Sequence, residues 1–149
     1  MTLRIVGSYD YQVDDRKRIP LPPKHRDAFE AGAYLGKSNR PSIVLYTPEA
    51  LDKTAEIIEA IPAETREGED ARRDFFGSIW PTSKDAQGRV TLNEGLMAYA
   101  GITRDVRVIG VGDKFEIWDR ETHIAYEAEI HESRLRALAR RDPTQQQEG

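Results

Sequence analysis

The stretch that decides the fold is DDRKRIPLP at residues 14–22, because the chain returns to it as DAQGRVTLN at residues 85–93. Each version has an aspartate, an arginine four positions later, a β-branched residue directly after it, and a leucine two positions further on. The two versions are offset by 71 residues (85 − 14). These matches, repeated in order along the chain, predict a duplicated small domain with an internal two-fold axis. The flanking matches are VGSY at 6–9 with FGSI at 76–79, and IVLY at 43–46 with FEIW at 115–118.

Both copies show the same order of expected elements: a strand, a polar turn, a short strand, a short helix, a two-stranded hairpin and a longer helix. The Gly-containing turn at 110–114 is typical of a hairpin. Asn93 and Thr47 are favourable N-caps for a short and a longer helix. The pattern predicts an α+β protein. The expected strands are 9–13, 18–21, 33–35 and 43–46 in the first copy, and 79–83, 89–92, 106–109 and 115–118 in the second.

Apolar residues at helical spacing form a stripe on each longer helix, which is expected to face the core rather than a partner surface. The two tryptophans are expected in the core or in subunit contacts. The tail after Arg141 is polar and is expected to be disordered. The stripes are Leu51, Ala55 and Ile58 in the first copy, and Ile124, Ala128, Leu135 and Leu138 in the second; the tryptophans are Trp80 and Trp118.

The domain organisation follows from the repeat. Pro62 and the polar run 64–70 separate the copies, and Ala71, Phe75 and Phe76 indicate a short helix between them. We expect the first repeat at 5–51, a helical connector at 52–76, the second repeat at 77–123, and a C-terminal helix and tail at 124–149.

Composition limits the class of protein. The 149 residues include no cysteine, which excludes disulfides, thiolate zinc sites and cysteine nucleophiles. No apolar run approaches the roughly 18 residues of a membrane helix, and the N-terminus lacks a signal-peptide pattern, so a cytoplasmic protein is expected. The net charge is −4, but residues 1–40 hold eight Lys/Arg against five Asp/Glu. A nucleic-acid binder would therefore work through a local basic patch.

Nothing in the sequence indicates an enzyme. The three histidines, His25, His123 and His131, lack metal-ligand spacing and are expected in packing or surface roles. The pair Gly110 and Gly112 begins like a dinucleotide-binding motif, but no third glycine follows and the next element is a strand. We therefore expect no catalytic residues, no metal and no cofactor.

The Asp-x-x-x-Arg motif, present twice at a strand–turn–strand junction, allows two interpretations. In the structural one, the aspartate caps the turn and the arginine neutralises it. In the functional one, the carboxylate braces an arginine whose fork points outward toward a phosphate or a guanine edge. Arg16 and Lys17 add donors in the first copy; Gln87 and Gly88 take the corresponding places in the second.

The motifs in combination resemble the MraZ family of bacterial proteins, over residues 3–126. The resemblance is carried by GSY at 7–9, DDRKRIPLP at 14–22 with Arg26, DAQGRVTL at 85–92, VIG at 108–110 and EIWD at 116–119. It implies two tandem AbrB/SpoVT-like swapped-hairpin β-barrel repeats with helices, related by a pseudo-two-fold axis. It also implies a ring-shaped homo-oligomer that regulates transcription of the division and cell-wall gene cluster, binding direct repeats upstream of its own operon.

The same resemblance implies which residues contact double-stranded DNA. Arg18 and Arg89 would contact phosphates or guanine edges, and the two aspartates would orient them. The partners implied are DNA and further copies of the chain in the bacterial cytoplasm, at the nucleoid, with no membrane and no small-molecule substrate. The alternative is a non-enzymatic ring-forming module whose loops bind a protein. The full set of expected DNA-binding residues is Asp14, Arg16, Lys17, Arg18, Arg26, Asp85, Gln87 and Arg89.

Two positions depart from the family pattern. Lys17 stands where a glycine usually precedes the first arginine, so we expect a less tightly turned first loop. Asn93 stands where a proline is often found, and it is expected to cap the following helix without loss of the fold.

Overall fold

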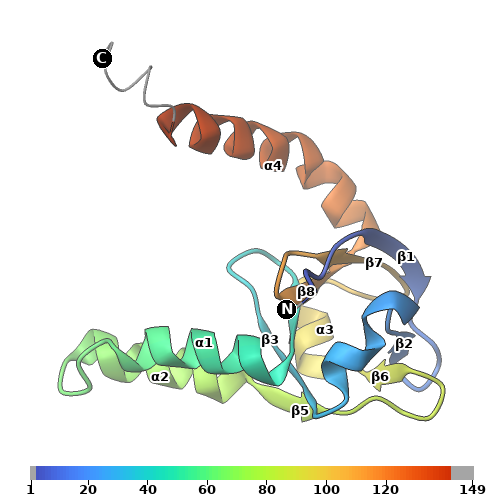
Figure 1. Ribbon diagram of the computed structural model, residues 1–149, viewed down its shortest axis with the longest axis horizontal. Coiled ribbons are helices and arrows are strands. Elements are labelled where there is room, and N and C mark those ends of the chain that lie inside the picture. The colour runs from blue at the N-terminus through green and yellow to red at the C-terminus, as the bar shows by residue number, and fades with distance from the viewer. Residues whose placement is uncertain (1–2, 142–149) are drawn as a thin grey trace. The chain divides into compact units, whose positions relative to one another are not determined.

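The computed structural model describes residues 3–141 (Figure 1). The chain divides into two units, 1–119 and 120–149. The tail after Arg141, for which disorder is expected, lies outside the described residues. In chain order the elements are β1 (Ser8–Gln12), β2 (Arg18–Pro20), the 3-10 helix η1 (Pro23–Phe29), β3 (Ala33–Lys37), β4 (Ile43–Tyr46), α1 (Pro48–Glu59), α2 (Arg66–Ser78), β5 (Trp80–Thr82), β6 (Arg89–Thr91), α3 (Glu94–Ala100), β7 (Asp105–Gly110), β8 (Lys114–Asp119) and α4 (Arg120–Arg141).

The strands of the two copies are interleaved in one antiparallel sheet of order β1-β7-β8-β4-β3-β5. The first strand of the first copy, β1, pairs with the hairpin of the second, with Ser8 opposite Ile109. The corresponding strand of the second copy, β5, pairs with β3 of the first. The two hairpins meet through β4 and β8. Neither copy therefore completes its own sheet, and the prediction of an α+β fold is confirmed.

Local sequence explains where the helices begin. Thr47 caps α1, its hydroxyl accepting from the Ala50 N–H at 3.1 Å. Asn93 caps α3 by accepting from the Leu96 N–H at 3.0 Å, as expected, and the left-handed Gly101 ends that helix.

The connector between the copies is more helical than its composition suggests. Helix α2 begins at Arg66, inside the polar run that we expected to be a separator. The reason is that Thr65 caps the helix, since its hydroxyl accepts from the Gly68 N–H at 3.0 Å. The negative charges of Glu67 and Glu69 also interact favourably with the positive N-terminal end of the helix dipole.

The core lies beneath the sheet and the β2–β6 ribbon. Its fully buried members come from both copies; they include Ile19, Leu21, Val90, Phe115 and Ile117. His25 is also buried, with its Nε2 accepting from the Val6 N–H at 3.3 Å, which agrees with a packing role. Trp118 is buried as expected, whereas Trp80 is 51 % exposed and does not belong to the core.

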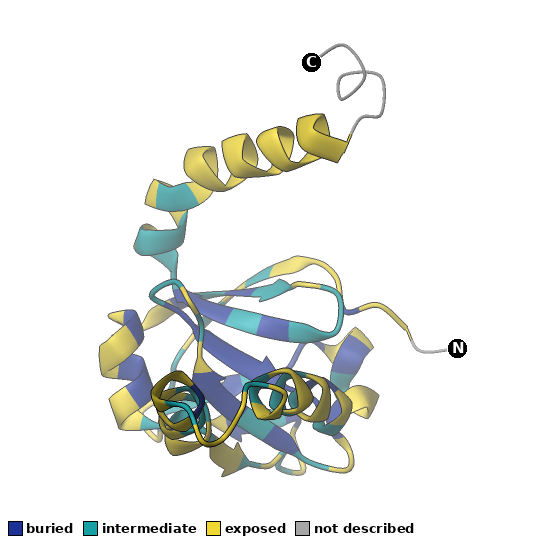
Figure 2. Ribbon diagram, turned by 90° about the vertical axis from the view of Figure 1, so that its left-hand side faces the viewer, coloured by how far each residue is buried: buried dark blue, intermediate teal, exposed yellow. Residues whose placement is uncertain are grey.

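Helix α4, described by itself, buries none of its residues (Figure 2). In this helix Ile124, Leu135 and Leu138, members of the stripe expected to face the core, are each about half exposed. In the stripe on α1, Leu51 is partly buried and packs against the cluster that contains Val44 and Tyr46. Among the described residues, no helix has the length and apolar character that crossing a membrane requires.

Candidate nucleic-acid interface

The two Asp-x-x-x-Arg loops meet at the short antiparallel ribbon of β2 and β6. Ile19 faces Val90 in this ribbon, and the two are equivalent positions of the repeat (90 − 19 = 71). The local two-fold axis therefore passes through this pair. Equivalent backbone bonds flank it: the Leu21 N–H donates to the Gly88 carbonyl at 2.8 Å, and the Leu92 N–H donates to the Lys17 carbonyl at 2.7 Å.

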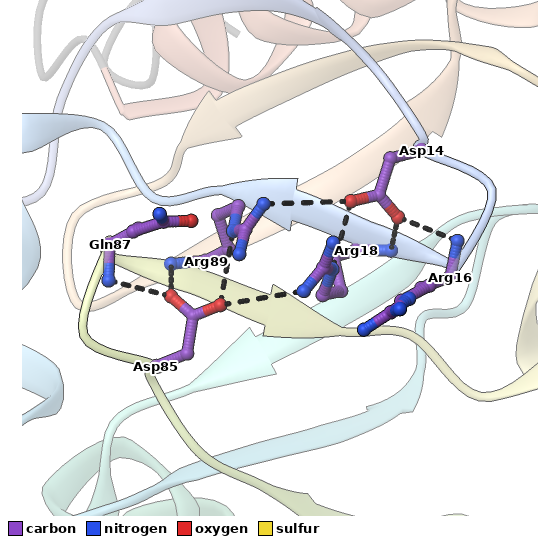
Figure 3. Close-up of polar contacts among 6 residues, drawn as sticks. All are labelled: Asp14, Arg16, Arg18, Asp85, Gln87 and Arg89. Carbon is purple, nitrogen blue, oxygen red and sulfur yellow. Dashed lines mark hydrogen bonds and ion pairs between the residues drawn. The ribbon is translucent and has the colours of Figure 1, made fainter.

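Each aspartate organises its own loop in the same way (Figure 3). Asp14 Oδ1 accepts from the backbone N–H groups of Arg16 and Arg18 at 2.9 and 2.8 Å, and its Oδ2 accepts from Arg18 Nε at 2.8 Å. Asp85 accepts from the Gln87 and Arg89 N–H groups at 2.9 and 2.9 Å, and from Arg89 Nε at 3.0 Å. The carboxylate thus fixes both the turn and the arginine.

The arginines also reach across the axis. Arg18 Nη1 lies 4.0 Å from Asp85 Oδ2, and Arg89 Nη1 lies 3.9 Å from Asp14 Oδ2. We call these four side chains the Asp–Arg quartet. Its members are partly exposed, between 22 and 34 %. Two carboxylates and two guanidiniums give the quartet no net charge. Each arginine faces the carboxylates through Nε and Nη1, so only its Nη2 lacks a partner among the described residues.

The quartet aspartates are stabilised as carboxylates. The backbone N–H of Arg18 is the largest influence that lowers the pKa of Asp14 below its ordinary value, with the Arg18 side chain and the Arg16 N–H adding to it. The backbone N–H of Arg89 lowers the pKa of Asp85 in the same way. Both aspartates are therefore ionised at neutral pH.

Lys17 does not loosen the first loop. Its φ of 61° is left-handed, as is the φ of 77° at the equivalent Gly88. The Lys17 and Gly88 N–H groups both donate at 3.0 Å, to the carbonyls of Asp14 and Asp85. The expectation of a less tightly turned loop is wrong, because the hydrogen bonds of the motif hold lysine in a conformation that costs a non-glycine residue roughly 1–2 kcal/mol.

The remaining candidates surround the quartet. Arg16 and Gln87 occupy equivalent, exposed loop tips, and the Arg16 guanidinium has no partner among residues 3–141. Arg26 Nε donates to the Leu21 carbonyl at 3.1 Å, and its guanidinium lies over Gly88, so this residue of the first copy lies beside the second loop.

Lys17 is directed away from the quartet. Its Nζ lies 2.7 Å from Glu94 Oε1, in the first turn of α3. Glu94 is a partner that the sequence patterns did not predict. The available signal was the position of Glu94 directly after the second motif, which the repeat brings beside the first.

Known proteins resemble this chain over most of its length. A model of the family described as "MraZ protein, putative antitoxin-like" matches residues 82–145. A protein of Thermobifida fusca named "Transcriptional regulator MraZ" is 34 % identical over 124 residues, 83 % of this chain and 87 % of the relative. Proteins of the same name from Corynebacterium efficiens and Mycobacterium ulcerans are 35 % identical over 124 residues (83 % and 87 %) and 33 % identical over 134 residues (90 % and 93 %).

Fold and site together define a class of protein: a duplicated α+β chain in which two Asp-x-x-x-Arg loops meet about a local two-fold axis. The relatives share about a third of their residues with this chain over most of both lengths. The chain belongs to the MraZ family.

Proposed function

We propose that this chain is a DNA-binding regulator of transcription, and that the face bearing the Asp–Arg quartet contacts duplex DNA. The names of its relatives support regulation of transcription. The observation that carries the DNA contact is the quartet itself, because two equivalent loops with braced arginines meet at a two-fold axis and present Arg16 and Gln87 at their tips.

The loops would divide the work of recognition. Arg16, whose guanidinium has no partner among the described residues, suits a phosphate contact, and Arg26 adds positive charge nearby. Lys17 would contact a phosphate by exchanging its ion pair with Glu94 for it. Arg18 and Arg89 are held by carboxylates, so their remaining Nη2 donors are pre-oriented for a phosphate or a guanine edge. Asp14 and Asp85 would act as positioning residues.

The proposed architecture is a tandem pair of AbrB/SpoVT-like swapped-hairpin repeats at 5–51 and 77–123, with a connector at 52–76 and a C-terminal segment at 124–149. Its support is the exchange of β1 and β5 between the hairpins of the two copies. In this view the β2–β6 ribbon is the point at which the swapped hairpins cross.

The proposed assembly is a ring that binds direct repeats upstream of its own operon, at the nucleoid in the bacterial cytoplasm, without enzymatic activity, cofactor or metal. A neutral quartet on a chain of net charge −4 would bind DNA weakly as a single copy. Several copies engaging successive repeats would raise the overall affinity through effective concentration.

The test is fluorescence anisotropy with the upstream region of the protein's own operon and a shuffled duplex, across a salt series. Arg18→Lys with Arg89→Lys keeps the charge but removes the fork, so we expect loss of sequence-selective binding with non-selective binding retained. A second variant, Arg16→Ala, removes the charge at the tip of the first loop. Its matched control is Arg66→Ala, which removes the same charge from a side chain that is 92 % exposed on α2. Absence of selective binding by the unaltered protein would overturn the proposal.

A second candidate is a module whose loops bind a protein, which the antitoxin-like description of the family favours. Salt dependence separates the two. Release of counterions from phosphates gives DNA binding a slope of about −0.9 per phosphate neutralised in a plot of log K against log salt. A pull-down that depends on Arg16 and Arg89, together with no selective DNA binding, would favour the protein partner.

A further inference from the structure

Helix α4, taken by itself, carries a face with exposed apolar side chains. From Glu127 to Arg141 every residue is exposed, and Ile124, Leu135 and Leu138 are 52, 49 and 51 % exposed. In proteins, a helix gains most of its stability by packing an apolar face rather than from the intrinsic preferences of its residues. A partner for this face is therefore physically favoured.

The spacing of that face matches a coiled-coil seam. The positions 124, 128, 131, 135 and 138 alternate steps of four and three residues, which is the heptad pattern of core positions. They hold Ile124, Ala128, His131, Leu135 and Leu138, which we call the α4 seam. The seam fits another helix better than it fits a flat surface, because knobs of this spacing insert between the side chains of a facing helix.

The charges of α4 identify the partner helix. Residues 121–132 contain four glutamates and no Lys or Arg, and residues 133–141 contain four arginines and no acid. A second α4 running antiparallel would place each acidic half against a basic half. A parallel pair would place Glu127 beside the partner copy's glutamate at position 132 and align the basic halves with each other.

The helix dipole does not account for this division of charge. Acidic residues near a helix N-terminus and basic ones near its C-terminus are favourable, but the effect is confined to the first and last turns. Glu127, Glu129 and Glu132 lie beyond the first turn of a helix that begins at Arg120. Within the helix, Glu127 lies 3.7 Å from His123 and Glu132 lies 3.9 Å from Arg136, and the division of charge also suits a charged partner that lies along the helix.

We propose that α4 is a homotypic docking helix, and that two copies of this chain pair antiparallel through the α4 seam. In the register centred on Ser133, Ala128 faces Leu138 of the other copy and His131 faces Leu135. Such a contact has two-fold symmetry, whereas a ring closes through head-to-tail contacts. The α4 contact is therefore distinct from ring closure, it joins copies in pairs, and it does not depend on the proposed DNA binding.

The test exploits the absence of cysteine from the chain. Full-length Ala128→Cys and Leu138→Cys variants, carrying tags of different size, are mixed and mildly oxidised. Antiparallel pairing predicts a disulfide between positions 128 and 138 that exceeds either same-position product several-fold. Predominant same-position products would show parallel pairing and overturn the proposal. The control pair is Ile130→Cys with Ala137→Cys, which lie on another side of the helix. A yield of the 128–138 disulfide no higher than the yield from this control pair would also overturn the proposal.

Sedimentation velocity then measures the contribution of the seam. Leu135→Ser with Leu138→Ser should weaken the pairing roughly tenfold or more, because two apolar side chains leave the interface. Ile130→Ser removes a similar side chain outside the seam and should leave the pairing unchanged, and His131→Leu should strengthen it. Equal effects of the seam and control variants would overturn the proposal. DNA binding is measured on the same samples, so a failure of the quartet and a failure of α4 can be told apart.

Discussion

Arg18 reaches across the local two-fold axis to Asp85, with its Nη1 4.0 Å from Asp85 Oδ2. The equivalent contact places Arg89 Nη1 3.9 Å from Asp14 Oδ2. Arg18 and Asp85 are 67 positions apart in the chain (85 − 18) and belong to different copies of the repeat. The two loops therefore share their charges, and a change in one aspartate alters the surroundings of both arginines.

The first prediction concerns this shared charge. Arg18→Ala and Asp85→Ala should each lower the urea midpoint, and the double variant should lose less than the sum of the two, because the singles remove the same interaction. The cycle of Arg18→Ala with Asp52→Ala is the control, since Asp52 lies on α1 and is exposed. Additivity in the first cycle would show that the loops are independent.

The second prediction concerns the axis residue beneath the quartet. Ile19 is completely buried, so Ile19→Ala should lower the free energy of unfolding by roughly 2–5 kcal/mol through reduced burial and a residual cavity. Ile57→Ala is the control; Ile57 is 68 % exposed on α1, and its truncation should change the same quantity by less than about 0.5 kcal/mol. Denaturant titration followed by circular dichroism checks both.

The third prediction separates two glycines. Gly88→Ala places a Cβ at a φ of 77° and within 2.6 Å of the Arg26 guanidinium carbon, so it should lower the free energy of unfolding by about 1–2 kcal/mol. Gly77→Ala lies in α2 with open space around it and should raise that free energy by up to about 1 kcal/mol. Equal shifts of the two unfolding midpoints would contradict the strained turn.

The fourth prediction concerns pH. The lowered pKa values of Asp14 and Asp85 mean that the folded state favours their carboxylates. Their stabilising contribution is complete above the ordinary pKa of 3.8 and is lost as the pH falls through the lower folded values. The urea midpoint should therefore fall below that pH more steeply than in the Asp14→Asn, Asp85→Asn variant. Parallel curves for the two proteins would refute the prediction.

The fifth prediction concerns the difference between the loop tips. Arg16 and Gln87 are equivalent, but only Arg16 carries charge. Arg16→Ala should lower the steepness of the salt dependence of DNA binding by about one unit for each phosphate that is no longer neutralised, whereas Gln87→Ala should leave it unchanged. Equal slopes for the two variants would contradict a phosphate contact by Arg16.

Much of the fold could be predicted because local signals and the repeat agree. The hairpin strands, the caps at Thr47 and Asn93 and the end at Gly101 all follow from turn and capping chemistry. The exchange of β1 and β5 between the copies did not follow from residue patterns, because alternation indicates a strand but not its neighbour.

The contacts within each loop of the site could be predicted from the sequence, but the contacts between the two loops could not. The bracing of Arg18 by Asp14 follows from spacing alone, since both belong to one turn. The cross-axis contacts and the pairing of Lys17 with Glu94 depend on how the copies meet. The stripe of α4 shows a further limit of prediction from sequence. Helical periodicity identifies an apolar face but does not say what packs against it.

The pairing of β1 with β7 also governs how the protein is made. Ser8 must find Ile109, which is synthesised 101 residues later (109 − 8), so the first strand cannot complete its hydrogen bonds while the ribosome is still producing the first copy. Folding that depends on such distant contacts is slow and leaves strand edges exposed. The first half therefore cannot complete its part of the sheet before β7 and β8 have been synthesised.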